Sequence, residues 1–133
     1  MTHPTLGSIL LASTDPQRLR AWYAAALAPR KNEDVEGYGM LDFGGFYLMI
    51  DSRDDIDEVN TDPARVILNF DVDDARVVAV NIDDLGGPWL APIEDRDGSL
   101  FGTAVDPDGN YVQIIQLSAE HRAAMASEQL ATN

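Results

Sequence analysis

The chain of 133 residues contains no cysteine, and this absence excludes several classes of protein. Without cysteine there is no disulfide framework, no thiolate metal site and no cysteine nucleophile. The first residues, Met-Thr-His-Pro, also lack the basic and apolar regions of a secretory signal. From these two features we expect a cytoplasmic protein.

Long apolar runs are missing as well. The longest, Ile9 to Ala12 and Phe46 to Ile50, fall far short of the roughly 18 to 20 residues that cross a bilayer. We therefore predict that the chain does not cross a membrane.

Basic side chains are scarce, since 9 Lys and Arg residues stand against 23 Asp and Glu residues, for a formal net charge of −14. Such a charge repels phosphate backbones, so nucleic acid is not an expected partner. The acidity either serves solubility alone or attracts a cationic ligand. The remaining composition, 45% hydrophobic and 24% charged, is that of one ordinary folded domain spanning residues 1–133.

The first half of the chain predicts a strand, a helix and then further strands. The stretch Leu6 to Thr14 has a buried-strand pattern, and Asp15-Pro16 then provides a helix cap followed by proline in the first turn. A helical face follows and stops at Pro29; its apolar residues are Leu19, Trp22, Tyr23, Ala26 and Leu27. We place Trp22 in the core.

A hairpin is predicted next. The strands 38–43 and 46–50 flank Gly44-Gly45, a pair that can adopt the positive φ angles of a tight turn, and a short strand near Val35 can precede them. The acidic stretch 51–63 has no apolar periodicity and is interpreted as a surface linker.

The pattern then restarts. A strand is expected over 64–72, followed by a helix capped by Asp73 or Asp74 and ended by Gly86-Gly87-Pro88. Three strands follow over 89–93, 100–105 and 111–117, the last two joined by the turn Asp106-Pro107-Asp108-Gly109-Asn110. The segment Ser8–Asp15 corresponds in this order to Ile67–Asp74. The sequence thus predicts two modules, at about 6–51 and 64–117, with a linker over 52–63 and a tail over 118–133 that forms either a short helix or a frayed end.

Two βαβββ modules, the segment SILLASTDPQRLRAWYAAALA and the ending DLGGPWLAPIEDRDGSLFGTAVDPDGNYVQIIQ resemble the vicinal oxygen chelate superfamily of glyoxalases, bleomycin resistance proteins and extradiol dioxygenases. The resemblance implies an α+β fold in which the two modules form a cupped mixed sheet. In the enzymes of this superfamily the cup carries a divalent metal. It also implies a homodimer, because relatives of this length pair modules between chains, and sheet edges need partners.

The metal ligands of the family do not carry over. The two strand-opening histidines correspond to Ser8 and Ile67, the glutamate after the DPDGN turn to Gln113, and the remaining ligand falls near Met49. A hydroxyl, an alkyl group, an amide and a thioether give a divalent ion no charge compensation. We therefore predict no metal and no other cofactor.

Other potential ligands remain. A slipped register could bring Asp51, Asn69 or Asp71 inward in place of the family positions. The only histidines, His3 and His121, lie outside the matching strands, where we expect solvent-exposed terminal residues.

Period-two alternation predicts which residues line the cup. Those facing it would be Ser8, Tyr47, Met49, Ile67, Asn69, Tyr111 and Gln113, with Trp89 and Phe101 as an aromatic wall. They either contact a small-molecule ligand or simply fill the curled sheet. No nucleophile with an adjacent base stands out, so the catalytic residues are unknown.

The sequence favours a metal-free, small-molecule binding protein that resembles the bleomycin resistance proteins and sequesters a cationic or aromatic compound. The alternative is a lyase, isomerase or dioxygenase with a remodelled metal site. A third interpretation is a structural or regulatory subunit with a filled cup.

Overall fold

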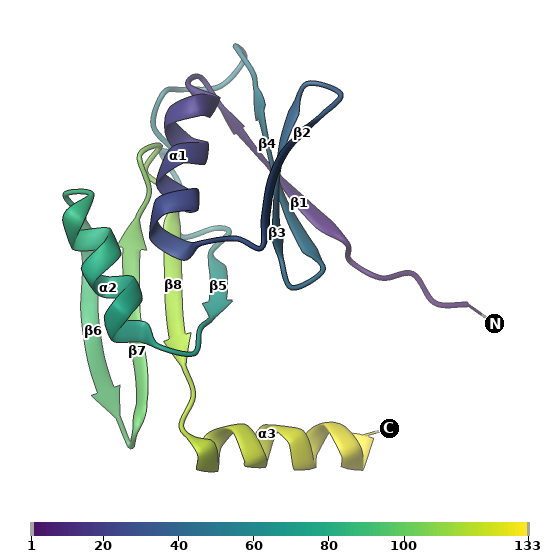
Figure 1. Cartoon of the computed structure of the whole chain (residues 1–133), viewed down its shortest axis with the longest axis vertical. Coiled ribbons are helices and arrows are strands. Elements are labelled where there is room, and N and C mark those ends of the chain that lie inside the picture. Colours follow the sequence, from purple (N-terminus) through teal and green to yellow (C-terminus); the bar gives the residue numbers. More distant parts are fainter. Residues whose placement is uncertain (1, 133) are drawn as a thin grey trace.

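The computed structural model describes residues 2–132, and within them the same order of elements occurs twice (Figure 1). The first module consists of β1 (Ser8–Ser13), α1 (Pro16–Leu27), β2 (Lys31–Val35), β3 (Tyr38–Phe43) and β4 (Phe46–Ser52). The second consists of β5 (Leu68–Asp71), α2 (Ala75–Asp84), β6 (Trp89–Arg96), β7 (Ser99–Val105) and β8 (Tyr111–Gln116), and α3 (Ala119–Thr132) follows. The predicted α+β fold with duplicated βαβββ modules is confirmed.

Each module forms a four-stranded sheet with the same topology. The strand orders are β1-β4-β3-β2 in sheet 1 and β5-β8-β7-β6 in sheet 2, and the first strand of each module runs parallel to its last. β5 is shorter than the strand expected over 64–72, and β6 is longer than the strand expected over 89–93. Because no strand of one sheet pairs with a strand of the other in the described chain, β1 and β5 both lie at sheet edges.

Local sequence explains where the helices begin. The side chain of Asp15 accepts a hydrogen bond from the Arg18 backbone, and Pro16 occupies the first turn of α1. Asp74 caps α2 by accepting from the backbones of Arg76 and Val77. Both are cases of an acidic side chain satisfying amides that a helix leaves free at its start.

The core lies between each sheet and its helix. From the helices, fully buried residues such as Leu19, Tyr23 and Ile82 meet Leu48 of β4 and Ile114 of β8. Trp22 is 5% exposed, which confirms its predicted place in the core. One face of each sheet is therefore buried, and the opposite face is left open.

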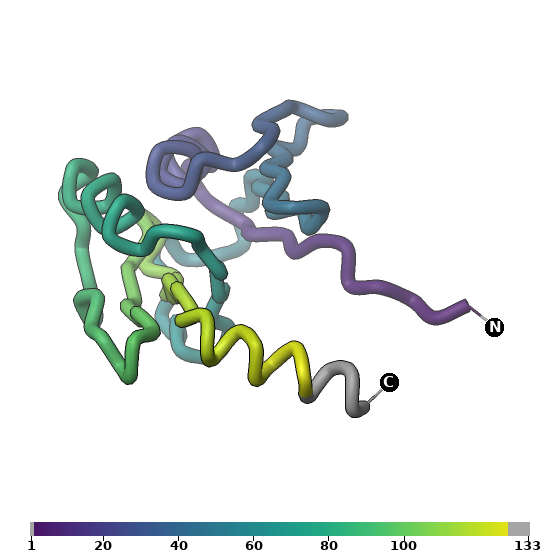
Figure 2. Tube along the Cα trace, turned by 60° about the horizontal axis from the view of Figure 1, so that its bottom comes forward, coloured from purple at the N-terminus to yellow at the C-terminus, as the bar shows by residue number. Residues whose placement is uncertain are grey.

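The two modules pack together through their helices, which lie side by side in both views (Figures 1 and 2). Asn81 of α2 donates to the backbone carbonyl of Ala26 in α1 at 3.3 Å. The ring of Phe70 in β5 lies 4.9 Å from that of Phe43 and 6.3 Å from that of Tyr23. Aromatic contacts and this amide are among the contacts that connect the modules.

Helix α3 follows β8 and extends away from the sheets (Figure 1). Its first turn is held by Ser99, whose hydroxyl contacts His121 and accepts from the backbone of Ser118 at 2.8 Å. Of the two interpretations of the tail, the structure supports the helix. None of the described helices is both long and apolar enough to cross a membrane.

Candidate functional site

The open face of sheet 1 is mainly apolar. In the strand register Ser8 lies opposite Tyr47, and Leu10 lies opposite Met49, which in turn faces Met40 of β3. Leu10 is 47% exposed and Tyr47 is 36% exposed, so a single chain leaves this face uncovered. Methionine side chains adapt readily to the shape of a ligand, and the tyrosine adds a polar hydroxyl to an apolar ring.

The open face of sheet 2 carries three successive rows of side chains. Tyr111 of β8 lies beside Val105, and Gln113 lies between Thr103 of β7 and Asn69 of β5. In the third row, Phe101 lies beside Ile115. Paired residues in neighbouring strands share a face, so an uncharged polar row is flanked by an aromatic side chain on either side.

Charged groups at the margin of this face are paired with one another. Arg96 forms an ion pair with Glu94, and its guanidinium carbon lies 5.6 Å from the centre of the Phe101 ring. On the other side, Arg122 of α3 forms an ion pair with Asp71, with each of its two terminal nitrogens 3.2 Å from a carboxylate oxygen. A cation already lies against Phe101, and both carboxylates have partners.

Two predicted site residues lie elsewhere. Trp89 pairs with the buried Ala104, packs against the core and donates its indole N–H to Asp83 of α2 at 2.8 Å, so it faces the helix and not the cup. Ile67 precedes β5 and so lies outside the paired strands; like Asn69, it borders a groove of about 920 Å³ between the modules. Alternation along β6 could not predict the face on which Trp89 lies, because two register irregularities interrupt the pairing of β6 with β7.

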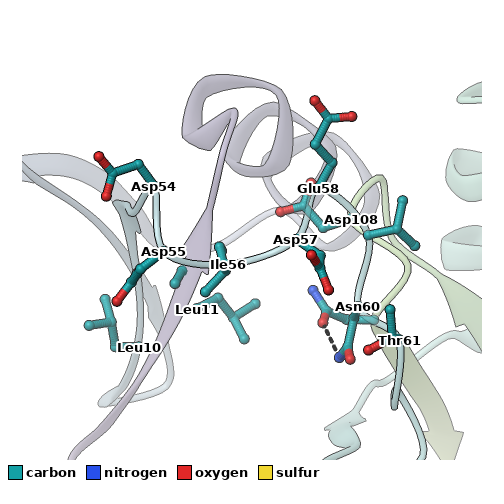
Figure 3. A pocket seen from close by; sticks show the side chains of 13 residues that line it. Leu10, Leu11, Asp54, Asp55, Ile56, Asp57, Glu58, Asn60, Thr61 and Asp108 are labelled. Carbon is teal, nitrogen blue, oxygen red and sulfur yellow. Dashed lines mark hydrogen bonds between the residues drawn. The ribbon is translucent and has the colours of Figure 1, made fainter.

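The predicted acidic linker covers the edge of β1 and encloses a cavity of about 670 Å³ (Figure 3). Its floor is formed by Leu10, Leu11 and Ala12, and its walls carry the carboxylates of Asp54, Asp55, Asp57, Glu58 and Asp108. The linker is fixed at one end, where the side chain of Asn60 donates to that of Asn110 at 2.8 Å. This acidic cavity lies next to the open face of sheet 1, to which Leu10 belongs.

The residues at the family's metal positions do not fit a divalent ion. Ser8 and Met49 lie on sheet 1 and Gln113 lies on sheet 2, and none of them offers a charged oxygen or an imidazole. Among residues 2–132, no group of three or more His, Cys, Asp or Glu side chains converges in a way that could hold a metal.

The residues considered as replacement metal ligands do not come together either. Asp51 and Asn69 lie on different sheets, and the carboxylate of Asp71 forms an ion pair with Arg122. His121 contacts Ser99 at the start of α3, and His3 is exposed.

Sequence reasoning did not identify several residues of these faces. Met40, Glu94, Arg96 and Thr103 were not predicted, although Met40 and Thr103 follow directly from the register of β3 with β4 and of β7 with β8. Correct pairing of the two hairpins, counted outward from their turns, would have found both.

The comparisons with known proteins agree with this architecture. A family model described as a glyoxalase-like domain matches residues 8–115. The chain belongs to the glyoxalase-like domain family. Membership in the vicinal oxygen chelate superfamily follows, as the resemblance implied.

Solved structures of the glyoxalase-like fold cover most of the chain. One is a glyoxalase/bleomycin resistance protein/dioxygenase family enzyme from Burkholderia phytofirmans PsJN, with 14% identity, a TM-score of 0.69, and coverage of 86% of this chain and 100% of that one. An integron cassette protein from Vibrio cholerae shares 19% identity at a TM-score of 0.66, covering 89% of this chain and 98% of the other. The oxidase ChaP-H2 shares 16% identity at a TM-score of 0.72, covering 88% and 96%.

These identities establish the fold and not an activity. A comparison with curated proteins finds no significant match. Within the glyoxalase-like domain family, function depends on the residues of the site, which must therefore be argued from their chemistry.

Proposed function

We propose that this glyoxalase-like protein is a metal-free, small-molecule binding protein that sequesters a flat aromatic compound without transforming it. The observation that carries the proposal is the pair of open sheet faces, which combine apolar and aromatic side chains with uncharged polar groups and a few charged ones, such as Asp51. Such a mixture is typical of ligand pockets, where apolar area supplies affinity and polar groups fix orientation. The donor set at the family's metal positions supports binding over metal-assisted chemistry.

We further propose that two chains form a homodimer in which sheet 1 of one protomer faces sheet 2 of its partner. The support is that both faces are uncovered in one chain: sheet 1 exposes Leu10 and Tyr47, and sheet 2 carries the half-buried rings of Phe101 and Tyr111. Pairing them would bury this apolar surface and enclose a pocket with one apolar wall and one hydrogen-bonding wall.

A positive charge on the ligand is favoured by the linker cavity. Asp55 and Asp108 form ion pairs with Arg53 and Arg18, so it is the other carboxylates of the cavity, Asp54, Asp57 and Glu58, that together with the net charge of −14 raise the local concentration of cations beside the pocket. Tyr47 and Tyr111 can contribute cation–π contacts of about 0.5 to 2 kcal/mol each, so buried ligand surface must supply most of the affinity.

Calorimetric titration of flat aromatic cations against neutral and anionic analogues of equal size tests this function. We expect micromolar or tighter binding, weakened about tenfold by Tyr47→Ala or Tyr111→Ala, with the ligand recovered unchanged by mass spectrometry. Trp89→Phe is the matched aromatic control, because Trp89 faces the helix. Chemical turnover would favour the enzyme alternative, and binding insensitive to both tyrosines would reject the pocket.

A further inference from the structure

The middle row of sheet 2 consists of uncharged hydrogen-bonding groups across three strands. Gln113 of β8 lies opposite Asn69 of β5 on one side and Thr103 of β7 on the other. Asn69 is exposed and the other two are half-buried, and no side-chain hydrogen bond joins them to other described residues. Two amides and a hydroxyl thus lie in one row across the sheet, and their donors and acceptors can form hydrogen bonds with a ligand.

The surroundings of this row are electrically neutral, which is unexpected in a chain of net charge −14. The two carboxylates that border it are Glu94, paired with Arg96, and Asp71, paired with Arg122. Arg96 also covers one side of the Phe101 ring. A ligand cation placed here would meet a ring that already has a cation, and carboxylates that already have partners, so this face does not favour a charge.

The chemistry of the row favours a ligand group that both donates and accepts. An amide side chain offers a carbonyl acceptor and N–H donors in one plane, and a hydroxyl can take either role. A carboxylate ligand would find no cation in the row, whereas an ammonium group would leave the N–H donors unmatched. A carboxamide, a lactam or a peptide bond can pair with donor and acceptor together.

We propose that Asn69, Gln113 and Thr103 select, among flat aromatic ligands, those that carry an uncharged amide edge. This inference rests on the proposed function and specifies the ligand class of the same pocket. Tyr111 lies two residues before Gln113 on the same face of β8, where its ring can pack against the aromatic body of the ligand. A positive charge elsewhere on that ligand is compatible, because Asp51 stands on the open face of sheet 1.

The test is calorimetry of the 133-residue chain with four probes of similar size: naphthamide, naphthyl methyl ketone, naphthoate and naphthylmethylammonium. The ketone keeps the acceptor of the amide but lacks the N–H donor. We expect naphthamide to bind about tenfold more tightly than the ketone, the size of effect that one or two net hydrogen bonds produce.

Substitutions assign this preference to the row. Gln113→Met keeps the side-chain length without the amide, and should remove the advantage of naphthamide over the ketone. Thr103→Val and Asn69→Leu should each reduce it. Gln113→Glu should shift the preference to naphthylmethylammonium. Gln17→Leu, on the exposed side of α1, is the control and should change the affinity for neither naphthamide nor the ketone. Thermal melting checks that every variant is folded.

The outcomes separate this inference from the proposed function. Equal affinity for naphthamide and the ketone, with both still dependent on Tyr111, would overturn the selection by the row and leave the pocket intact. An amide preference that survives Gln113→Met would also overturn it. No binding of any probe, or binding independent of Tyr47 and Tyr111, would overturn the pocket and the inference together.

Discussion

Asp106 is 2% exposed and holds several groups at the junction of the modules. Its carboxylate accepts from the Tyr23 hydroxyl at 2.6 Å, from the Asn110 side chain at 2.8 Å, and from the backbones of Asp108 and Asn110. The sequence predicts only a turn at this position. Through its hydrogen bond with Tyr23, Asp106 also connects the turn between β7 and β8 to α1. Burial, and then the nearby Asp106 carboxyl, raise the pKa of Tyr23 well above its ordinary value, so the phenol remains a donor.

Removing the Tyr23 hydroxyl should therefore destabilise the fold. We expect Tyr23→Phe to lower the free energy of unfolding by about 1 to 3 kcal/mol, because a buried carboxyl loses a donor. Urea unfolding followed by tryptophan fluorescence measures this. Tyr38→Phe is the control, since the Tyr38 hydroxyl bonds to no described residue, and an equal effect of both changes would contradict the prediction.

The Asp106 carboxyl should also give the stability a specific pH dependence. Burial raises its pKa above the ordinary value, although hydrogen bonds from Tyr23 and Asn110 oppose the shift. The folded state then keeps this proton to higher pH than the unfolded state, so the stability contributed by Asp106 is full below the ordinary pKa and is lost as pH rises through the raised one.

Comparison with Asp106→Asn isolates that contribution. As pH rises from about 4, the ordinary carboxyl range, the stability advantage of the natural protein over Asp106→Asn should shrink. Urea unfolding at a series of pH values measures it. An advantage that grows with pH would mean that the hydrogen-bond donors outweigh burial.

The residues at the family's ligand positions lead to a further prediction. Purified protein should contain less than about 0.1 equivalent of Mn, Fe, Co, Ni, Cu or Zn, because Ser8, Met49, Ile67 and Gln113 cannot offset the desolvation of a divalent ion. Elemental analysis by mass spectrometry provides the measurement. Near-stoichiometric metal that is lost in Gln113→Ala would refute it.

At the scale of elements, the close contact between β6 and β7 depends on a missing side chain. A Cβ atom on Gly102 would lie 2.6 Å from the end of the Ile93 side chain and 3.1 Å from its backbone. Ile93 lies within the second register irregularity of β6, between Ala91 and Glu94, and packs against the core. Gly102 thus allows β6 to approach and to place Ile93 and Trp89 on the helix side.

Gly102→Ala should accordingly destabilise the protein by about 1 to 3 kcal/mol, the usual cost of forcing extra volume into a packed core. Thermal or urea unfolding measures the loss. Gly7→Ala is the matched control, since nothing lies within 4 Å of a Cβ atom there, and it should be nearly neutral. An equal loss of unfolding free energy in the two variants would show that Ile93 can move to accommodate the added methyl group at little cost.

At the scale of the molecule, the sheet edges differ in how they are protected. β2 is a fully exposed strand of mostly polar and charged residues, KNEDV, and β6 is irregular. β1 has the uncharged sequence SILLAS, part of whose edge the linker covers, and β5 is a short strand, LNFD, whose Asp71 is paired with Arg122. Charges and bulges discourage edge pairing, so β1 and β5 are less protected against association than β2 and β6.

We predict a homodimer of about 29 kDa, twice the 14.5 kDa of one chain. Sedimentation equilibrium at micromolar concentration measures the mass. Leu10→Asp should shift the equilibrium to monomer, because it places a charge in the apolar open face, whereas Val80→Asp on the exposed side of α2 should not. A natural protein that sediments as a monomer would reject the dimer and the pocket closed by it.

The sequence by itself determined the order of the elements, the caps at Asp15 and Asp74, the Gly44-Gly45 hairpin and the family. It also determined which donors are missing at the metal positions. These features depend on local spacing and on residue type, so they can be read along the chain. The same spacing placed Ser8, Tyr47 and Met49 on one face, because β1 and β4 pair without irregularity.

Only the tertiary structure decided which way Trp89 points, what covers Phe101, and that Thr103 completes a row with Gln113 and Asn69. A shift of one residue in a strand moves every later side chain to the other face, and β6 contains two such irregularities. The burial of Asp106 was equally hidden, since it depends on α1, 83 residues away in sequence, packing over a turn that looks solvent-exposed on its own. These features depend on packing between residues that are far apart in the chain, and local sequence patterns do not predict such packing.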